Sequence, residues 1–435
     1  MRAFVIALSG ALLAPAAAPA QPAPAAAAQV NPEAVVSQVR AVIAERYVLP
    51  ERRAALDAVL AEGLSSGRYR TADPATLAER INADLTRVGR DRHLNFTYAP
   101  DRAAQLSARG PGNAPDNSDY EREVRAGNHG INALRVLPGN VRYMDYRGFD
   151  WIGPESAAAL DNAMRFLSGG EAAIIDLRYN GGGSPEAVQY LVSHFMEAGR
   201  PLVTFHFAGQ PGQTLQTLAE VPAGRMVGKP LYVLTSNGTA SAAEEFVGHV
   251  AGYRLGEVVG DTTGGAGFRN QLVPVEGGFV FSVSVGRAVL ASTGRDWEAV
   301  GIAPTMRTDV AAALDAAQSA ALRRLAAAAP AGQRARLEAI ADTLAAAAER
   351  RPTALPLAAY AGSYGERSVV AQDGRLFYRR GNRAPMSLIS LGGNRFAFAD
   401  NPVTQLVFAA SGTSVSAFEM GPVGGPVQGR YERTQ

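Results

Sequence analysis

Hydrophobic residues recur at helical spacing in the first part of the chain, from Asn31 to about Gly89. The segment "NPEAVVSQVRAVIAERYVLP" begins with Asn31 as a cap and Pro32 at the first helical position. The segments "ERRAALDAVLAEGL" and "DPATLAERINADLTRV" repeat the amphipathic pattern. This pattern predicts a small N-terminal helical domain.

The pattern then changes from helical spacing to apolar runs of strand length. Residues 99–130 are polar, with Gly, Pro and Asn, which is typical of a loop. Predicted strands follow at "INALRVL", "NVRYMDYR", "AAIIDLRY", "PLYVLTS" and "GFVFSVSVGRAVL". Predicted helices lie between them at "ESAAALDNAMRFLSG" and "SPEAVQYLVSHFMEAG". Alternation of strands and helices predicts an α/β core with a buried sheet.

The C-terminal third has two further patterns. An alanine-rich helical stretch runs from about residue 308 to Arg351, and short alternating strands follow Pro352 and Pro356. The predicted organisation is a signal peptide (1–20), a disordered linker (21–30), an N-terminal helical domain (31–98), a loop (99–130), an α/β core (131–308), an Ala-rich helical linker (309–354) and a small β-domain (355–435).

The extreme N-terminus has the order of a secretory signal peptide. Arg2 precedes an apolar stretch from Ala3 to about Leu13, and Ala18-Pro19-Ala20 offers small residues for cleavage. An anchor helix is the alternative, but the apolar run is short for a bilayer span. We expect an exported protein, periplasmic or secreted, with no membrane span in the mature chain.

Composition excludes several classes of site. The 435 residues carry 42 basic and 40 acidic side chains, a net charge of +2, which gives no support to a nucleic-acid partner. The absence of cysteine excludes disulfides, thiolate metal sites and cysteine nucleophiles. Lys229 is the only lysine, which restricts the residues that can act as a base.

The stretch "TSNGTASAAEEFVGHV", residues 235–250, joins a predicted strand to a predicted helix. Ser241 and Glu244 have the S-x-x-E spacing of a capping box, which is the ordinary role of such a serine. A sharp turn of this kind also points a side chain out of the sheet, beside a helix N-terminus that can bind an oxyanion. The pattern G-x-S-x-G is absent, so this is not a standard α/β-hydrolase elbow.

A serine nucleophile needs a base. Lys229 lies before the strand and Ser241 beyond its other end, about 20 Å away. Arginine stays protonated and tyrosine is a weak base, which leaves histidine or a carboxylate of raised pKa. We rank His93, two residues after Asp91, first. The remaining histidines are His206 in a strand, His129 in a turn, His194 on a polar helix face and His249 two helical turns beyond Ser241.

A glycine-rich turn occurs in "IIDLRYNGGGS", residues 174–184. Glycines allow close backbone approach to a ligand and direct N–H groups at it. The nucleotide patterns G-x-G-x-x-G and Gly-Lys-Ser/Thr are not satisfied, so a nucleotide site is not expected. A simple tight turn is the alternative.

Four motifs in order resemble one family. The sequence "DLRYNGGGS", then "LTSNGTASAAEEF", "VVGDTTGGAG" and "DWEAVGIAPTM", is similar to the tail-specific or C-terminal-processing serine peptidases, over roughly residues 31–308. The resemblance implies a ClpP/crotonase-like core and places the nucleophile at Ser241. In the processing branch a lysine serves as base, but Ala266 occupies that position here and no PDZ domain is evident in 99–130.

The other branch resembles the tricorn-protease core and interphotoreceptor retinoid-binding protein. Its pattern implies His93 as base, within Asp91-Arg92-His93, and Glu298 as its supporting carboxylate. Arg92 stands where the tricorn core has a serine, so a fourth hydroxyl of the relay is not expected.

The resemblance also implies the rest of the site. The oxyanion hole would use the amides of Ala242 and of one glycine of 181–183, for which we select Gly182. Asp176, Arg178 and Asn180 would hold the loop. No metal or cofactor is expected, and a peptide or protein is the expected substrate. The rival interpretations are a non-catalytic module of this fold that holds an apolar ligand or peptide, and a crotonase-type enzyme that binds coenzyme A.

Overall fold

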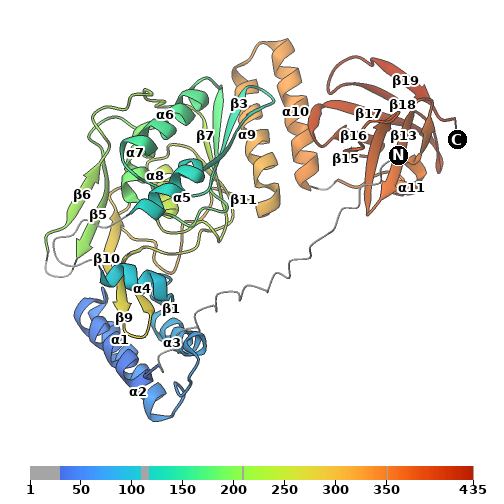
Figure 1. The fold of residues 1–435 in the computed structure, drawn as a ribbon. Coiled ribbons are helices and arrows are strands. Elements are labelled where there is room, and N and C mark those ends of the chain that lie inside the picture. Colours follow the sequence, from blue (N-terminus) through green and yellow to red (C-terminus); the bar gives the residue numbers. More distant parts are fainter. Residues whose placement is uncertain (1–29, 109–116, 208–209, 350, 435) are drawn as a thin grey trace, which may run out of the picture.

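The computed structural model describes residues 30–108, 117–207, 210–349 and 351–434 (Figure 1). The predicted signal peptide and nearly all of the predicted linker therefore lie outside the described residues. Among the helices that are described, none combines the length and the apolarity needed to cross a bilayer.

Three helices open the described chain and pack on a sheet of the core. They are α1 (Pro32–Arg46), α2 (Pro50–Ser65) and α3 (Pro74–Gly89). Asn31 caps α1 as predicted, since its side chain accepts from the N–H of Glu33 at 3.1 Å. The apolar faces of these helices bury side chains against Phe96, Phe279 and Phe281. The helices and this sheet therefore share one hydrophobic core.

Residues 99–130, predicted as a loop, contain two short helices, α4 (Pro100–Ser107) and α5 (Ser118–Ala126), and a 3-10 turn, η1 (Asn128–Gly130). The prediction was wrong there because polar residues dominate both helices, which bury only a few side chains. Ala103, Leu106 and Val124 are the buried ones. Their apolar stripe is too narrow to stand out in the sequence.

A six-stranded sheet forms the centre of the core, in the order β11-β8-β7-β4-β3-β2. All neighbouring strands are parallel except β2 and β3. The strands are β2 (Ile131–Leu137), β3 (Val141–Tyr146), β4 (Ala172–Asp176), β7 (Leu231–Thr235), β8 (Glu257–Gly260) and β11 (Met306–Arg307). Every residue of β4 and β7 is buried, as expected for central strands covered on both faces.

Helices cover both faces of this sheet. One face packs on α6 (Pro154–Ser168), α7 (Pro185–Ser193) and α8 (Ala242–Gly252). The other face packs on α9 (Ala313–Ala328) and α10 (Ala331–Glu349), which follow the 3-10 turn η2 (Val310–Ala312). In β4, Ala173 and Ile175 point to the first face, and Ala172 and Ile174 to the second.

The segment 309–354, predicted as a helical linker, is therefore a structural layer of the core, and the linker prediction was wrong. Its alanines make this packing possible, because their small side chains let the helices lie close to the sheet. Ala313, Ala317 and Ala321 of α9 are completely buried. Figure 1 shows α9 and α10 side by side, between the core and the C-terminal strands.

A second sheet joins the N-terminal helices to the core. It consists of β1 (Asn95–Tyr98), β5 (Pro201–Phe207), β6 (Gln213–Gln216), β9 (Phe268–Val275) and β10 (Phe279–Leu290). The order is β1-β10-β5-β6, and β9 also pairs with β10. Antiparallel pairing sets Phe96 of β1 opposite Phe281 of β10. The segment just before β1 is thereby fixed against the core.

The C-terminal strands form an eight-stranded antiparallel sheet that nearly closes on itself, with the short helix α11 (Leu357–Tyr360) before it. The N–H of Thr434, beyond the last strand, donates to the carbonyl of Ser363 in the first. The strands are β12 (Gly362–Tyr364), β13 (Arg367–Gln372), β14 (Arg375–Arg380), β15 (Met386–Gly392), β16 (Arg395–Phe398), β17 (Asn401–Ser411), β18 (Ser414–Pro422) and β19 (Gly429–Glu432). The predicted fold class, an α/β core with helical N-terminal and all-β C-terminal parts, is confirmed.

Candidate active site

Ser241 occupies the turn between β7 and α8. Its backbone has φ +55° and ψ −122°, which residues other than glycine rarely adopt. The turn holds this conformation because its neighbours are buried and bonded. The side chain of Thr239 donates to the carbonyl of Leu177 at 2.7 Å, and the N–H of Ala240 donates to the carbonyl of Asn180 at 3.1 Å. A short loop exposed to solvent would instead relax to a more common backbone conformation.

His93 lies beside this serine. Its Nε2 is 3.2 Å from Ser241 Oγ, although the residues are 148 positions apart. The turn before β1 orients the ring, because Asp91 Oδ1 accepts from the N–H groups of His93 at 2.9 Å and Leu94 at 3.2 Å. The hydroxyl of Ser282 in β10 donates to the carbonyl of His93 at 2.6 Å. An imidazole at this distance can accept the serine proton.

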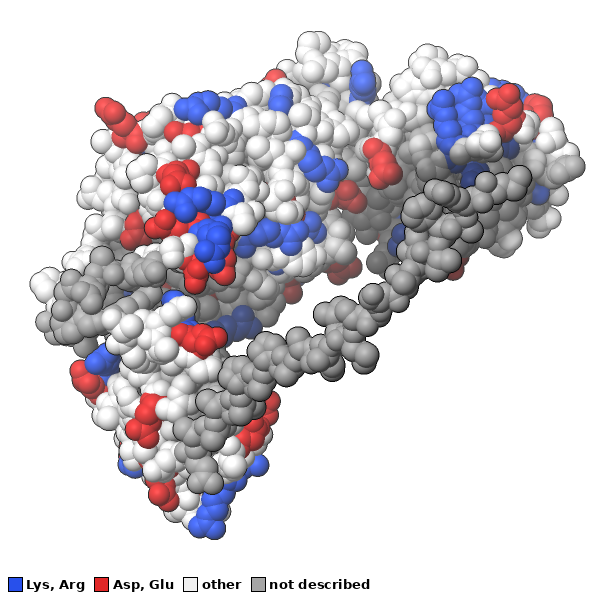
Figure 2. All heavy atoms as spheres, viewed as in Figure 1, with Lys and Arg blue, Asp and Glu red and all other residues white. Residues whose placement is uncertain are grey.

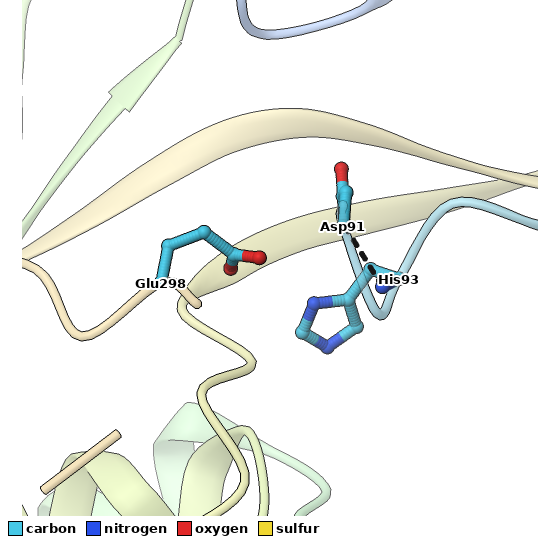
Figure 3. Close-up of side chains that lie close together, drawn as sticks. All are labelled: Asp91, His93 and Glu298. Carbon is cyan, nitrogen blue, oxygen red and sulfur yellow. Dashed lines mark hydrogen bonds between the residues drawn. The ribbon is translucent and has the colours of Figure 1, made fainter. Parts of the chain in front are cut away.

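Glu298 approaches the other side of the imidazole (Figure 3). Its Oε2 accepts from the N–H groups of Gly267 at 2.6 Å and Phe268 at 3.1 Å. Its Oε1 and His93 Nδ1 are both buried and have no hydrogen-bond partner. One ligand atom each from Asp91, His93 and Glu298 lies within 4.8 Å of the others. The carboxylate is close enough to stabilise an imidazolium electrostatically, and a small shift would bring it into hydrogen-bond contact.

Burial shifts both titrating groups toward their neutral forms. It lowers the pKa of His93, although the nearby Asp91 charge opposes the shift. Burial and the charge of Asp91 raise the pKa of Glu298 to about 8, against the two backbone N–H groups that it accepts from. A neutral His93 is a competent base. The Glu298 carboxylate lacks a positive neighbour, which a protonated His93 would supply.

The same three side chains are the one group of His and acidic residues, among those described, close enough to hold a metal ion. Their donor set of one imidazole and two carboxylates would suit zinc or manganese. A metal on His93 Nδ1 would leave Nε2 as a proton donor toward Ser241, so a metal and the serine–histidine pair are competing uses of these residues.

The glycine run lies against Ser241. A Cβ on Gly182 would lie 2.7 Å from the Cβ of Ser241 and 3.0 Å from the N of Ala242. The N–H of Gly182 donates to Asn180 Oδ1 at 2.9 Å, so it is already occupied and the selection of Gly182 as oxyanion donor is not supported. Gly183 lines the same cavity as Ser241 and Ala242, and its amide makes no hydrogen bond to the described residues. Ala242 and Gly183 are the better candidate pair.

Hydrogen bonds fix the glycine run through three residues, Asp176, Arg178 and Asn180. The Arg178 guanidinium donates to both carboxylate oxygens of Asp176, at 2.9 and 2.7 Å, and to the carbonyl of Val310 at 2.7 Å. Asn180 is completely buried and donates to the carbonyl of Tyr146 at 2.9 Å. The loop is thus fixed to β3, to β4 and to the start of the α9 layer.

Glu244 does more than the capping role assigned from the sequence. Its Oε2 accepts from the N–H of Ser241 at 3.0 Å and of Ala266 at 2.7 Å. Its Oε1 accepts from Thr263 Oγ1 and from the N–H of Gly265, both at 2.6 Å. This completely buried carboxylate ties the nucleophile turn to segment 263–266. The S-x-x-E spacing was its only signal in the sequence.

The other bases considered from the sequence have different partners. His129 Nδ1 contacts Ser156 Oγ at 2.9 Å, and His206 is exposed on β5. His194, predicted to be solvated, is completely buried and bonds the carbonyl of Tyr190 at 2.9 Å. The ammonium of Lys229 donates to the carbonyl of Gly170 at the far end of β7.

A small cavity of about 100 Å³ opens beside the nucleophile. Ser241, Ala242 and Gly183 line one part of it. The remaining walls come from α8 and from the β9 and β10 region, and include Glu245 and Trp297. The cavity admits a side chain and not a folded domain.

Comparison with known proteins finds two family matches. Residues 140–308 match peptidase family S41, and residues 26–126 match the N-terminal domain of peptidase S41 in eukaryotic IRBP. The carboxy-terminal processing protease CtpB of Bacillus subtilis is 32% identical over 109 residues, which are 25% of this chain. The chain thus spans only 22% of that relative's own length.

Solved structures of similar proteins include three peptidases. The photosystem II D1 C-terminal processing protease is 18% identical, with a TM-score of 0.42 over 65% of this chain and 94% of the other. A putative peptidase from Parabacteroides merdae is 17% identical, with a TM-score of 0.47 over 64% and 90%. The tricorn protease is 12% identical, with a TM-score of 0.40 over 64% and 34%.

Proposed function

We propose that this chain, whose residues 140–308 match peptidase family S41, is a serine peptidase that acts through Ser241, His93 and Glu298. The observation that carries the proposal is the 3.2 Å approach of His93 Nε2 to Ser241 Oγ, at a strained turn that opens a helix. A serine that served only as a helix cap would need neither a histidine beside its hydroxyl nor a backbone of positive φ.

The proposed reaction has two stages. Ser241 Oγ attacks the carbonyl carbon of the scissile peptide bond, and its proton passes to His93 Nε2. Amides at the start of α8 and in the glycine run stabilise the oxyanion. His93 then gives the proton to the departing amine. A water, deprotonated by His93, hydrolyses the ester that remains on Ser241, while Glu298 stabilises the imidazolium in both stages.

The proposed substrates are exported proteins or peptides. The N-terminal order of Arg2, apolar run and small residues supports export of the chain. Positive and negative side chains are interspersed over the core face in Figure 2, in line with the net charge of +2, which does not favour a nucleic-acid partner. The small cavity beside Ser241 supports an extended peptide that inserts one side chain.

Labelling with a fluorophosphonate, followed by peptide mapping, tests the proposal. A peptidase should carry the adduct on Ser241 and lose hydrolysis of a peptide mixture in proportion to labelling. A folded protein that takes no label and cleaves no peptide is instead a binding module of this fold, and the proposal fails.

A further inference from the structure

The cavity beside Ser241 contains one buried carboxylate, that of Glu245. It lies four residues after Ser241, so both face the same side of α8 and line the same cavity. Glu245 is only 3% exposed. The mechanism proposed above gives this group no role, since Glu244 and not Glu245 holds the nucleophile turn.

Glu245 has one potential charged partner among the described residues, the buried His249, and no hydrogen bond to it. Its carboxylate accepts no hydrogen bond from the described residues, and its Oε1 is fully shielded from solvent. The one basic group within 4.0 Å, among the residues described, is His249, whose Nε2 is 3.6 Å from Oε1, beyond hydrogen-bond length. A buried carboxylate without a donor is costly, so a partner that arrives with the substrate would explain its presence.

The rest of the cavity wall limits what that partner is. Phe205, Phe268, Ala288 and Trp297 supply apolar surface around the single carboxylate. A side chain with an aliphatic stem and a cationic end matches such a wall. The volume of about 100 Å³ equals that of about three waters, enough for one extended side chain.

Arg269 is the other charged residue that lines this cavity. Its guanidinium carbon lies over the ring of Phe205, 5.0 Å from the centroid, and it forms no ion pair within 4.0 Å with Glu245. Arg269 therefore covers an aromatic wall and does not neutralise Glu245, whose one basic neighbour within 4.0 Å among the described residues is His249.

We propose, resting on the peptidase function above, that this cavity binds a lysine or arginine side chain of the substrate, with Glu245 as counter-ion. The residue concerned is the one whose carbonyl Ser241 attacks, because Ser241 and the candidate oxyanion residues Ala242 and Gly183 all line this cavity. The protein would thus cleave after basic residues.

Two fluorogenic peptides that differ only in lysine or norleucine before the scissile bond test this. The wild-type protein should have a higher kcat/KM for the lysine peptide. Glu245→Gln should lower that kcat/KM by about 10- to 100-fold and leave the norleucine peptide nearly unchanged. The matched control is Glu220→Gln, at an exposed glutamate that forms no ion pair with the described residues, which should behave as wild type.

A second measurement needs no variant. Benzamidine, a cation, should slow phosphonate labelling of Ser241, whereas neutral benzamide should not. Preference for norleucine in the wild type, lysine preference that persists in folded Glu245→Gln, or equal protection by both compounds would overturn the inference. In those cases Ser241 still labels and peptides are still cleaved. An unlabelled Ser241 with no cleavage overturns the proposed function itself.

Discussion

His93 Nε2 and Ser241 Oγ lie 3.2 Å apart, and the two residues belong to different parts of the fold. The histidine precedes β1, directly after the N-terminal helices, and the serine precedes α8 in the core. This pair and its supporting carboxylate lead to four predictions, the glycine run to one and the N-terminus to one.

Ser241 should be the one serine that a phosphonate labels. Ser241→Ala should abolish hydrolysis and shift the melting temperature by only a few degrees, because loss of a cap costs about 1 kcal/mol. Intact mass, peptide mapping and thermal denaturation measure this. Ser184→Ala, which removes the cap of α7 at the end of the glycine run, is the control and should still be labelled at Ser241. An adduct on another serine would contradict the assignment.

His93→Ala should reduce turnover by about 10³-fold or more, because the hydroxyl then lacks a proton acceptor. Lys229→Arg should change little, since its ammonium bonds a carbonyl at the far end of β7. His206→Gln, at an exposed position, is the control. The measurement is the turnover of one peptide by each variant, with folding checked by circular dichroism. An inactive Lys229→Arg beside a near wild-type His93→Ala would exclude the proposed triad.

Glu298 should shape the pH dependence of kcat/KM. His93 must be neutral to act as base, and burial lowers its pKa. As the pH increases, kcat/KM should therefore rise first below about pH 6.5. Ionisation of Glu298, with its pKa raised to about 8, should give a second rise near that pH. Glu298→Gln should keep the first rise and lack the second, with lower activity above pH 8. A second rise that survives in this variant would assign it to another group.

Glu298 also gives a prediction for stability. The pKa of this acid is raised on folding, so its effect on stability is unfavourable above its unfolded pKa of about 4.5 and grows until about pH 8. Glu298→Gln should therefore melt higher than wild type at pH 9, with a smaller difference at pH 5. Equal differences at both values would mean that the carboxylate does not titrate in this range.

Gly182→Ala should impair catalysis more than Gly181→Ala. A Cβ at Gly182, where φ is +108°, would lie 2.7 Å from the Ser241 Cβ and 2.8 Å from the carbonyl of Ala240. The displaced loop should cost on the order of 10²-fold in kcat. A Cβ at Gly181 would meet nothing within 4 Å, which makes it the matched control. Comparable activity of the two variants would show that the loop tolerates the displacement.

Export should remove about the first 20 residues, because the N-terminus has the order of a signal peptide. N-terminal sequencing of the protein from its native host, after separation of cell fractions, measures this. A chain that still begins with Met1 in the cytoplasm would contradict it. A mutant with Arg2 and the apolar run intact but Ala18 and Ala20 replaced by bulky residues should remain uncleaved.

The order of motifs was enough to predict the match to peptidase family S41 over residues 140–308 and the fold class, because apolar runs and glycine turns are local signals. Elimination among the possible bases ranks His93 first, and the family resemblance implies its pairing with Ser241; their catalytic roles stay predictions. The layer formed by α9 and α10 was missed because alanine periodicity does not reveal which surface the helices cover. The environments of Glu244 and Glu245 could not be predicted from the sequence either. They are formed by segments 263–268 and 297–298, which come from later in the chain.

The shared sheet of β1, β9 and β10 has a consequence for the newly made protein. The base reaches the nucleophile only when β1 has paired with β10, so a chain with its N-terminal helices still undocked has no proton acceptor beside Ser241. The proposed proteolytic activity therefore requires that the N-terminal helices and the core are docked. Under the proposed mechanism, a chain in which these elements have not yet docked has no active serine.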